Sequence, residues 1–188
     1  MKTAVILSAR KDKGTDVPYP LKPYWEDYCL IDRTIEALTA LNYTNILLVV
    51  GGQAQLYQRY ASKTVRLVLN PDFKFTSSMG SLAMAAPYIK EDFLLVEGDT
   101  FYEYKVLKEL SETKNENCFA ITEESGSGDE AFVETRSGYI TKISKDRHQI
   151  CNFEGELLGI VKISKHAFDR MMNKWQNSNN PYLNYEYL

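Results

Sequence analysis

The sequence predicts a three-layer α/β/α Rossmann-like fold with a mostly parallel mixed sheet and a small antiparallel hairpin insertion. Three observations lead to this fold class. Short continuous apolar runs, such as residues 93–96, indicate strands that are buried on both faces. These runs alternate with segments of helical periodicity, which is typical of a parallel sheet covered by helices on both faces. Two segments at residues 131–136 and 139–144 flank Ser137-Gly138 and predict a hairpin.

The elements follow one another in order along the chain. The first apolar run leads into a polar, proline-bearing loop at residues 10–28, and the run at 65–70 is halted by Pro71. The acidic, glycine-rich stretch 123–130 is interpreted as a solvated loop, with a lid over a site as the alternative. The expected strands are residues 3–9, 45–52, 65–70, 93–96, 118–122 and 157–163, and the expected helices are residues 30–42, 54–60, 81–89, 105–113 and 165–175.

Length and composition indicate one globular domain over residues 1–188. The formal net charge of -3 argues against a nucleic-acid partner, while it permits a small phosphorylated ligand in a local basic pocket. The 3 cysteines lack CxxC spacing, which indicates reduced thiols. With no apparent signal peptide or membrane span, we expect a cytoplasmic protein without a membrane partner. A doubly wound domain usually closes with another helix or strand, so whether the native chain ends at Leu188 or continues beyond it stays open. The oligomeric state stays open.

The strand predicted at residues 93–96 runs directly into Glu97, Gly98 and Asp99. Open α/β sheets bind their ligands at the carboxyl ends of the strands. A carboxylate at this position either caps a helix or holds a cation, because it is costly to leave unpaired. Asp99 or Thr100 as the N-cap of the next helix is therefore the alternative to a ligand-binding role.

The loop after the first strand is rich in cations. Arg10, Lys11, Lys13 and Lys22 suit an anionic ligand, most often a phosphate. Lys22 lies between two prolines in a stiff, extended segment, which would favour the positioning of a catalytic lysine. The alternative is an exposed loop of solvated lysines.

Several segments follow one another in a characteristic order: AVILSA, PLKP, LIDRTIEAL, ILLVVGG, NPDFKFTSSMGSLAMA (residues 70–85), Gly98-Asp99 and EGELLGIVKIS (residues 154–164). This order resembles the nucleoside-triphosphate transferase (sugar-phosphate nucleotidyltransferase) family, and most closely its phosphocholine cytidylyltransferase branch. That family has a glycine-rich first loop, a Pro-Lys, and a strand that ends in Gly-Asp.

The glycine-rich loop departs from the family pattern. Arg10 and Asp12 stand where the first two glycines belong, and the segment from Leu7 to Lys22 is shorter. Glycines there let backbone N–H groups approach a triphosphate closely. Either the cationic side chains hold the phosphates instead, or the chain is a slow enzyme or a non-catalytic nucleotide-binding module.

The resemblance implies a set of site residues. Lys22 and Asp99 would be catalytic, and Asp99 and Glu186 would hold Mg²⁺. Gly98 would leave room for the nucleotide, and Gly80-Ser81 has a plain helix start as its alternative. The residues implied for nucleotide binding are Leu7, Ser8, Ala9, Arg10, Lys11, Gly51, Ser78, Gly80 and Ser81.

Aromatic residues near the metal ligands or in the C-terminal segment suggest the acceptor. Tyr102, Trp175, Tyr182 and Tyr185 could surround a quaternary ammonium such as choline, although an aromatic stripe is more often part of a core. Acidic side chains nearby would serve a primary amine, such as that of an aminoalkyl phosphonate, equally well.

The sequence therefore predicts a metal-dependent nucleotidyltransferase. Its partners would be a nucleoside triphosphate, CTP being favoured, and phosphocholine or a similar small phosphorylated or phosphonylated amine, with release of pyrophosphate. The alternatives are a sugar-1-phosphate nucleotidyltransferase and the non-catalytic nucleotide-binding module. A dinucleotide-dependent oxidoreductase is disfavoured, because no GxGxxG follows the first strand.

Overall fold

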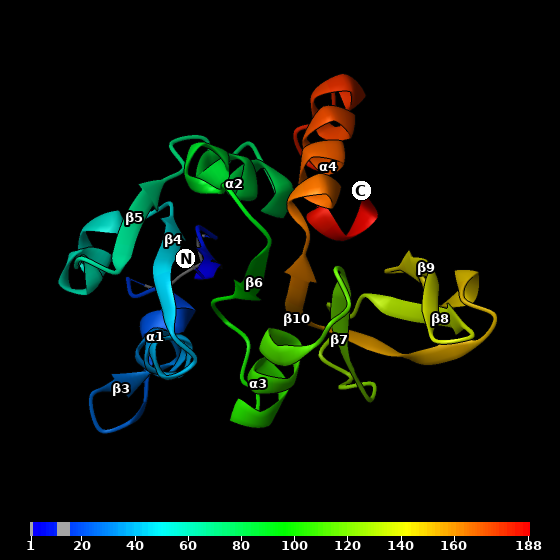
Figure 1. The fold of residues 1–188 in the computed structure, drawn as a ribbon, viewed down its shortest axis with the longest axis horizontal. Helices are drawn as coiled ribbons and strands as arrows, with labels where there is room; N and C mark the ends of the chain where they lie inside the picture. The colour runs from blue at the N-terminus through cyan, green and yellow to red at the C-terminus, as the bar shows by residue number, and fades with distance from the viewer. Residues whose placement is uncertain (1, 11–15) are drawn as a thin grey trace.

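The computed structural model describes residues 2–10 and 16–188 and places a twisted sheet between helices (Figure 1). In these residues the strands are β1 (Lys2–Ser8), β2 (Pro23–Trp25), β3 (Tyr28–Cys29), β4 (Tyr43–Val50), β5 (Val65–Leu69), β6 (Phe93–Glu97), β7 (Cys118–Thr122), β8 (Phe132–Arg136), β9 (Tyr139–Ser144) and β10 (Phe153–Ile163). The α-helices are α1 (Leu30–Ala40), α2 (Ser78–Ala85), α3 (Tyr104–Glu112) and α4 (Lys165–Ser178). Short 3₁₀ helices are η1 (Tyr19–Leu21), η2 (Ala54–Tyr60), η3 (Ala86–Tyr88), η4 (Arg147–Gln149) and η5 (Tyr185–Tyr187).

The main sheet has the strand order β5-β4-β1-β6-β10-β8-β9, and β7 pairs with β10. The first four of these strands are parallel, whereas β10 runs antiparallel to β6. This mixed, mostly parallel α/β sheet confirms the predicted fold class. The predicted hairpin is confirmed too, because Ser137 (φ 53°) and Gly138 (φ 78°) both adopt the positive φ that a type I′ turn needs.

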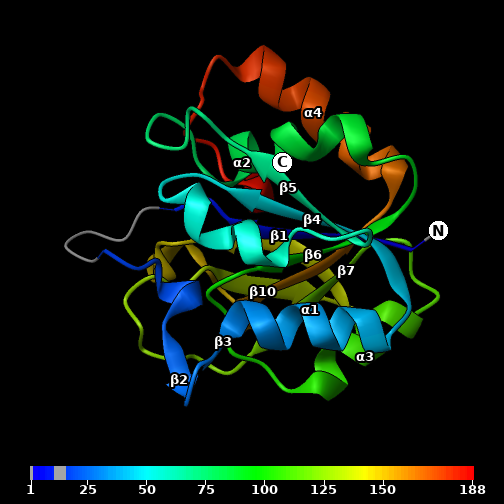
Figure 2. The same cartoon turned by 90° about the vertical axis from the view of Figure 1, so that its left-hand side faces the viewer.

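Helices cover both faces of the sheet, as Figure 2 shows, with α1 and α3 on one side and α2 and α4 on the other. Neighbouring residues of β4 point to opposite faces, so Ile46 and Leu48 pack on the α1 side and Leu47 and Val49 on the α2 side. A strand buried on both faces must be apolar at every position. This explains the unbroken hydrophobic runs from which the strands were predicted.

Three expected elements differ from the structure. Residues 118–122 were expected to continue the parallel alternation, but β7 pairs antiparallel with β10. The segment at residues 54–60 is 3₁₀ rather than α-helical. The helix expected at 81–89 begins at Ser78 and ends at Ala85, because Pro87 lies in the 3₁₀ turn η3 that follows. Gly80-Ser81 is therefore inside the helix and is not its start.

The remaining sequence-based expectations concern single residues. Cys29, Cys118 and Cys151 are free thiols, as the lack of CxxC spacing predicts, and the two histidines, His148 and His166, are exposed. Within residues 2–10 and 16–188, none of the helices combines the length and the apolar character needed to cross a membrane.

Phe168 anchors α4 to the sheet and is only 1% exposed, with its ring in an edge-to-face contact 5.3 Å from that of Phe93. Phe168→Ala should lower the free energy of unfolding by about 3–5 kcal/mol, because a large cavity replaces the ring. Urea denaturation followed by circular dichroism measures this change. Tyr139→Ala is the control, since Tyr139 is 77% exposed, and it should change stability by no more than about 0.5 kcal/mol. Equal effects of the two variants would contradict the packing described for α4.

Candidate functional site

A cavity of about 680 Å³ lies at the carboxyl edge of the parallel strands. This volume is in the range of small-molecule binding sites. One wall comes from the end of β1 and the segment that precedes α2, and the floor comes from the end of β6. The opposite wall comes from the β7–β8 loop, the end of β9, β10 and η5. The lining residues include Leu7, Ala9, Arg10, Phe73, Lys74, Thr76, Ser77, Ser78, Ser81, Glu97, Asp99, Asp129, Ala131, Lys145, Leu157, Gly159, Asn184, Tyr185 and Glu186.

Carboxylates are concentrated on the cavity floor. Glu97, at the end of β6, accepts a hydrogen bond of 3.0 Å from the Tyr185 hydroxyl. The pKa of Glu97 is raised to about 7, first by burial and then by the charge of Asp99, while the hydrogen bond from Tyr185 lowers it. Burial also raises the pKa of Glu186. Carboxyl groups held this close together in a partly desolvated cavity are a good environment for a cation.

Asp99 lies in the turn after β6 and is not a helix cap, since α3 begins at Tyr104 with Glu103 as its N-cap. Asp99 and Glu186 line the same cavity, although they are far apart in sequence. Mg²⁺ is commonly held by one or two carboxylates, several waters and substrate phosphates, and these two residues fit that need. Among residues 2–10 and 16–188, no group of three or more acidic, histidine or cysteine side chains could hold a metal ion. A metal held by Asp99 and Glu186 would take its other ligands from waters and substrate phosphates.

The wall next to α2 is held by Asn70, which is fully buried. Its side-chain amide donates to the hydroxyls of Ser81 (3.0 Å) and Thr76 (3.1 Å), and its carbonyl oxygen accepts from the backbone N–H of Asp72 (3.0 Å). Ser81 is therefore both a cavity residue and part of this network. The Ser78 hydroxyl accepts a 3.1 Å hydrogen bond from the backbone N–H of Tyr185 and so ties η5 to the first turn of α2.

Of the residues implied for nucleotide binding, the structure brings Leu7, Ala9, Arg10, Ser78 and Ser81 to the cavity. Lys11 lies outside the described residues.

Ser8, Gly51 and Gly80 have packing roles instead. The Ser8 hydroxyl is buried at 2.7 Å from that of Tyr57. A Cβ on Gly51 would lie 2.3 Å from the Ala9 carbonyl oxygen, and one on Gly80 would lie 2.4 Å from the Thr76 Cβ. These two glycines allow close approach of the surrounding chain.

Gly98, expected to leave room for a nucleotide, packs closely against β1. A Cβ on Gly98 would lie 2.9 Å from the Leu7 carbonyl oxygen and 3.2 Å from the side chain of Ser8. Its backbone N–H donates to that Leu7 oxygen at 2.8 Å. The missing Cβ of Gly98 therefore allows the close approach of β1, while the neighbouring residues Glu97 and Asp99 line the cavity.

Lys22 has the extended backbone that its two prolines predict, with φ -70° and ψ 128°. It is half-buried, does not line the cavity, and places its Nζ 5.8 Å from the centroid of the Tyr19 ring. The structure thus does not bring Lys22 together with Asp99.

The predicted aromatic set does not form a cage around the cavity. Of the four residues, Tyr185 alone lines the cavity. Tyr102 packs in the core on the α1 side and donates a 2.9 Å hydrogen bond to Thr34. Trp175 packs against the α2-side core from α4, and Tyr182 is 60% exposed. Tyr102 lies away from the cavity because the chain crosses to the other face of the sheet between Asp99 and α3.

Sequence reasoning assigned no role to several lining residues, among them Glu97, Asp129 and Lys145. Glu97 was visible beside Asp99 at the end of the same strand. Asp129 lies in the acidic loop and Lys145 directly follows β9. Their approach to the cavity depends on how β7–β10 fold back, which the local sequence does not signal.

No protein-family model matches the chain. A curated CMP-5'-(3-aminopropyl)phosphonate synthase from Streptomyces rubellomurinus is 26% identical over 110 residues, which make up 56% of this chain and 17% of that protein. The chain thus matches less than a fifth of that relative's length.

Two solved structures superpose over nearly the whole chain. The inositol-1-phosphate CTP transferase from T. maritima aligns with a TM-score of 0.79 and 18% identity, over 98% of this chain and 78% of that one. A candidate glucose-1-phosphate thymidylyltransferase from Bacillus anthracis aligns with a TM-score of 0.73 and 13% identity, over 97% of this chain and 86% of that one. The chain has a nucleotidyltransferase fold. Its neighbours by structure and by sequence are nucleotidyltransferases.

Asn70→Ala should lower the free energy of unfolding by about 2–4 kcal/mol, because it leaves Ser81, Thr76 and the Asp72 N–H without their buried partner. Thermal and urea denaturation would measure the loss. Asn177→Ala is the matched control, since the exposed Asn177 amide bonds only the Asn173 carbonyl oxygen of its own helix. A loss for Asn70→Ala no larger than for Asn177→Ala would show that this network does not hold the wall.

Proposed function

We propose that the protein is a metal-dependent nucleotidyltransferase that transfers CMP from CTP to a small phosphorylated or phosphonylated amine and releases pyrophosphate. The observation that carries this proposal is the convergence of Asp99, Glu186 and the cations Arg10 and Lys145 on one cavity at the carboxyl edge of the sheet. The nucleotidyltransferase fold of the chain supports it.

The reaction needs no side-chain nucleophile. An oxygen of the acceptor's phosphate or phosphonate forms a bond to the α-phosphorus of the nucleotide, and the bond from that phosphorus to the oxygen bridging the β-phosphate breaks. The protein must neutralise charge and hold the two anionic substrates in line. Asp99 and Glu186 would hold Mg²⁺, which when bound would neutralise charge on the reacting phosphates. Arg10, Lys74 and Lys145 supply the cations along the cavity walls.

The charge of the cavity favours an acceptor that carries an amine. Its lining contains the carboxylates Glu97, Asp99, Asp129 and Glu186 but fewer cations. With Asp99 and Glu186 assigned to the metal, Glu97 on the floor and Asp129 on the opposite wall remain. Once substrate phosphates bind Arg10 and Lys145, the sugar of a sugar phosphate supplies no positive charge to balance these two carboxylates. An ammonium or quaternary ammonium group on the acceptor would balance them. Phosphocholine and 3-aminopropylphosphonate both have this chemistry, and the second is supported by the name of the Streptomyces relative.

A polyol or sugar phosphate is the second candidate acceptor. It is favoured by the two solved neighbours, whose names specify inositol-1-phosphate and glucose-1-phosphate and which align over nearly the whole chain. CTP is favoured over other nucleotides by the T. maritima neighbour and by the Streptomyces relative.

The deciding experiment is a pyrophosphate-release assay that crosses CTP, UTP, ATP, GTP and dTTP with four acceptors, in the presence and absence of Mg²⁺. The acceptors are phosphocholine, 3-aminopropylphosphonate, inositol-1-phosphate and glucose-1-phosphate. We expect Mg²⁺-dependent release that requires CTP and one of the two amines. Release only with a polyol or sugar phosphate would select the second candidate. Nucleotide binding without release would identify a non-catalytic module.

Asp99→Asn should lower kcat at least about a hundredfold, because it removes the carboxylate charge proposed to hold the metal, while CTP binding is largely kept. Initial rates of pyrophosphate release and calorimetric CTP titration measure the two quantities. Glu109→Gln is the control, since Glu109 pairs with Lys105 on the surface of α3 and should leave the rate unchanged. An unchanged rate for Asp99→Asn would rule out the proposed role of Asp99.

The role of Lys22 stays a prediction. Lys22→Met should lower kcat if its ammonium reaches the phosphates during turnover, and the same rate assay tests this. The control is Lys63→Met, since Lys63 is an exposed lysine just before β5. Equal rates in the two variants would remove Lys22 from the catalytic set.

A further inference from the structure

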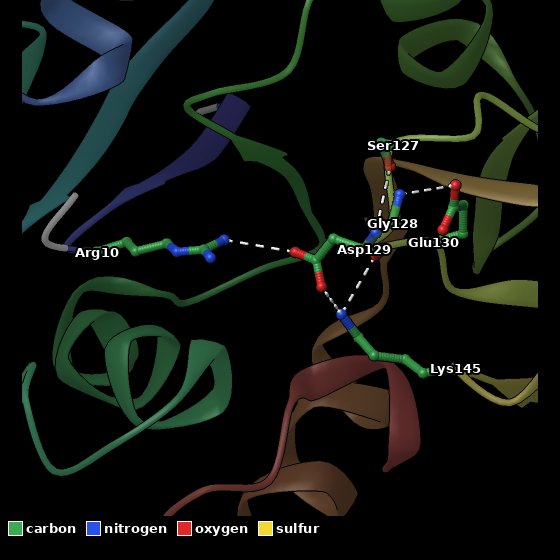
Figure 3. A network of polar contacts seen from close by, with 6 residues as sticks. All are labelled: Arg10, Ser127, Gly128, Asp129, Glu130 and Lys145. Atoms are coloured by element: carbon green, nitrogen blue, oxygen red, sulfur yellow. Dashed lines mark hydrogen bonds and ion pairs between the residues drawn. The ribbon is translucent and has the colours of Figure 1, made fainter. Parts of the chain in front are cut away.

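Asp129 joins cations from opposite sides of the cavity (Figure 3). Its carboxylate accepts a hydrogen bond from Arg10 Nη1 at 3.4 Å, and Arg10 lies two residues after the end of β1. The same carboxylate pairs with Lys145 Nζ, which also donates to the Asp129 backbone carbonyl oxygen at 3.2 Å. A single carboxylate thus occupies both cations from the two sides of the cavity.

The loop that carries Asp129 is held at both ends and is exposed between them. Gly126 and Gly128 have φ values of 69° and 83°, and a Cβ on either would meet nothing within 4 Å. The loop side chains at residues 123–129 are exposed. Its start is tied down by Glu156, which is 7% exposed and accepts a 3.1 Å hydrogen bond from the Ser125 backbone N–H. The Asp129 contacts to Arg10 and Lys145 hold the far end of the loop over the cavity.

We propose that Asp129 is an internal substitute for a substrate phosphate: it occupies Arg10 and Lys145 in the ligand-free protein, and a polyphosphate that binds these cations releases it and the loop. This inference rests on the proposed function, because it takes the cavity as the polyphosphate site. Asp129 carries a single negative charge on a well-solvated side chain that is 62% exposed. A polyphosphate carries several charges and more acceptor oxygens, so it outcompetes the carboxylate for both cations.

The Asp129–Arg10 and Asp129–Lys145 contacts, together called the latch, should therefore weaken anion binding. A ligand that binds only when Asp129 has released both cations has an apparent dissociation constant equal to its intrinsic constant divided by the fraction of protein in that state. Exposed pairs of this kind are individually weak, so the latch should weaken binding by about three- to tenfold. The longer and more exposed Arg10 contact is the first to open, since the Arg10 side chain is 74% exposed and that of Lys145 is 43% exposed.

The test is a calorimetric titration of the full chain with sodium pyrophosphate, without nucleotide or metal, at low ionic strength. Asp129→Asn should bind pyrophosphate about three- to tenfold more tightly than the wild type. Asp129→Glu, which keeps the charge, should restore wild-type affinity. Added salt should shrink the difference, because it screens the exposed pairs. A purely structural role for Asp129 would give weaker binding instead.

Glu130→Gln is the matched control. It removes the same charge from the same loop, but Glu130 does not line the cavity and accepts a hydrogen bond from the Gly128 backbone N–H of its own loop. Its affinity for pyrophosphate should equal that of the wild type. Equal tightening in Glu130→Gln and Asp129→Asn would overturn the latch, since a general change of charge would then explain both. No tightening in Asp129→Asn, or no binding in any variant, would overturn it as well.

The two proposals fail separately. Tighter pyrophosphate binding by Asp129→Asn in a protein that releases no pyrophosphate from any nucleotide and acceptor would keep the latch and remove the enzymatic function. An active enzyme in which Asp129→Asn does not tighten binding would keep the function and remove the latch.

Discussion

The hydrogen bond from the Gly98 backbone N–H to the Leu7 carbonyl oxygen holds the ends of β1 and β6 side by side, and the cavity depends on it. The two strands are parallel and in register up to Leu7 and Glu97. The bond extends that pairing into the turn, and the missing Cβ of Gly98 permits the approach. Arg10 and Asp99, one from each strand end, therefore line the same cavity. The proposed phosphate-binding cation Arg10 and the proposed metal ligand Asp99 thus both follow closely on the paired ends of two neighbouring strands.

The second half of the cavity exists because the sheet changes direction next to β6. β10 pairs antiparallel with β6, and on its other side the pairing with β7 shifts register between Leu157 and Val161. Gly159 lies within this shift with φ 77°, and a Cβ there would lie 3.2 Å from the Glu97 side chain. The irregularity lets β10 pass close to the Glu97 carboxyl group and still pair with β6 beyond it. The same strand then supports β7 and β8, and through their loop it carries Asp129 to the cavity.

The fold was predictable because its strands are apolar on both faces and its turns use residues with special backbone preferences. Asp99 and Glu186 were predicted as a pair from motif order, and both line the cavity. The aromatic residues were placed less well, because Tyr102 is close to Asp99 in sequence but lies on the opposite face of the sheet. Asp129 and Lys145 were not predicted, since their position follows from long-range antiparallel pairing and not from local patterns. Periodicity describes each element, but the order of strands in the sheet decides which loops meet.

The charges of the cavity explain why these features belong together. Burial raises the pKa of Glu97, and the nearby charge of Asp99 adds to the effect, so the ligand-free cavity holds negative charge at a cost in stability. Lys145 partly offsets that charge at Glu97 and Glu186 and at the same time holds Asp129. Transfer of Lys145 from Asp129 to a ligand would therefore also change the electrostatics of the carboxylates proposed to bind the metal. A metal, a polyphosphate and a cationic acceptor each relieve a different part of this imbalance, so their binding free energies should be coupled. In the proposed function the cavity would therefore act as one electrostatic unit, in which each substrate completes the site for the next.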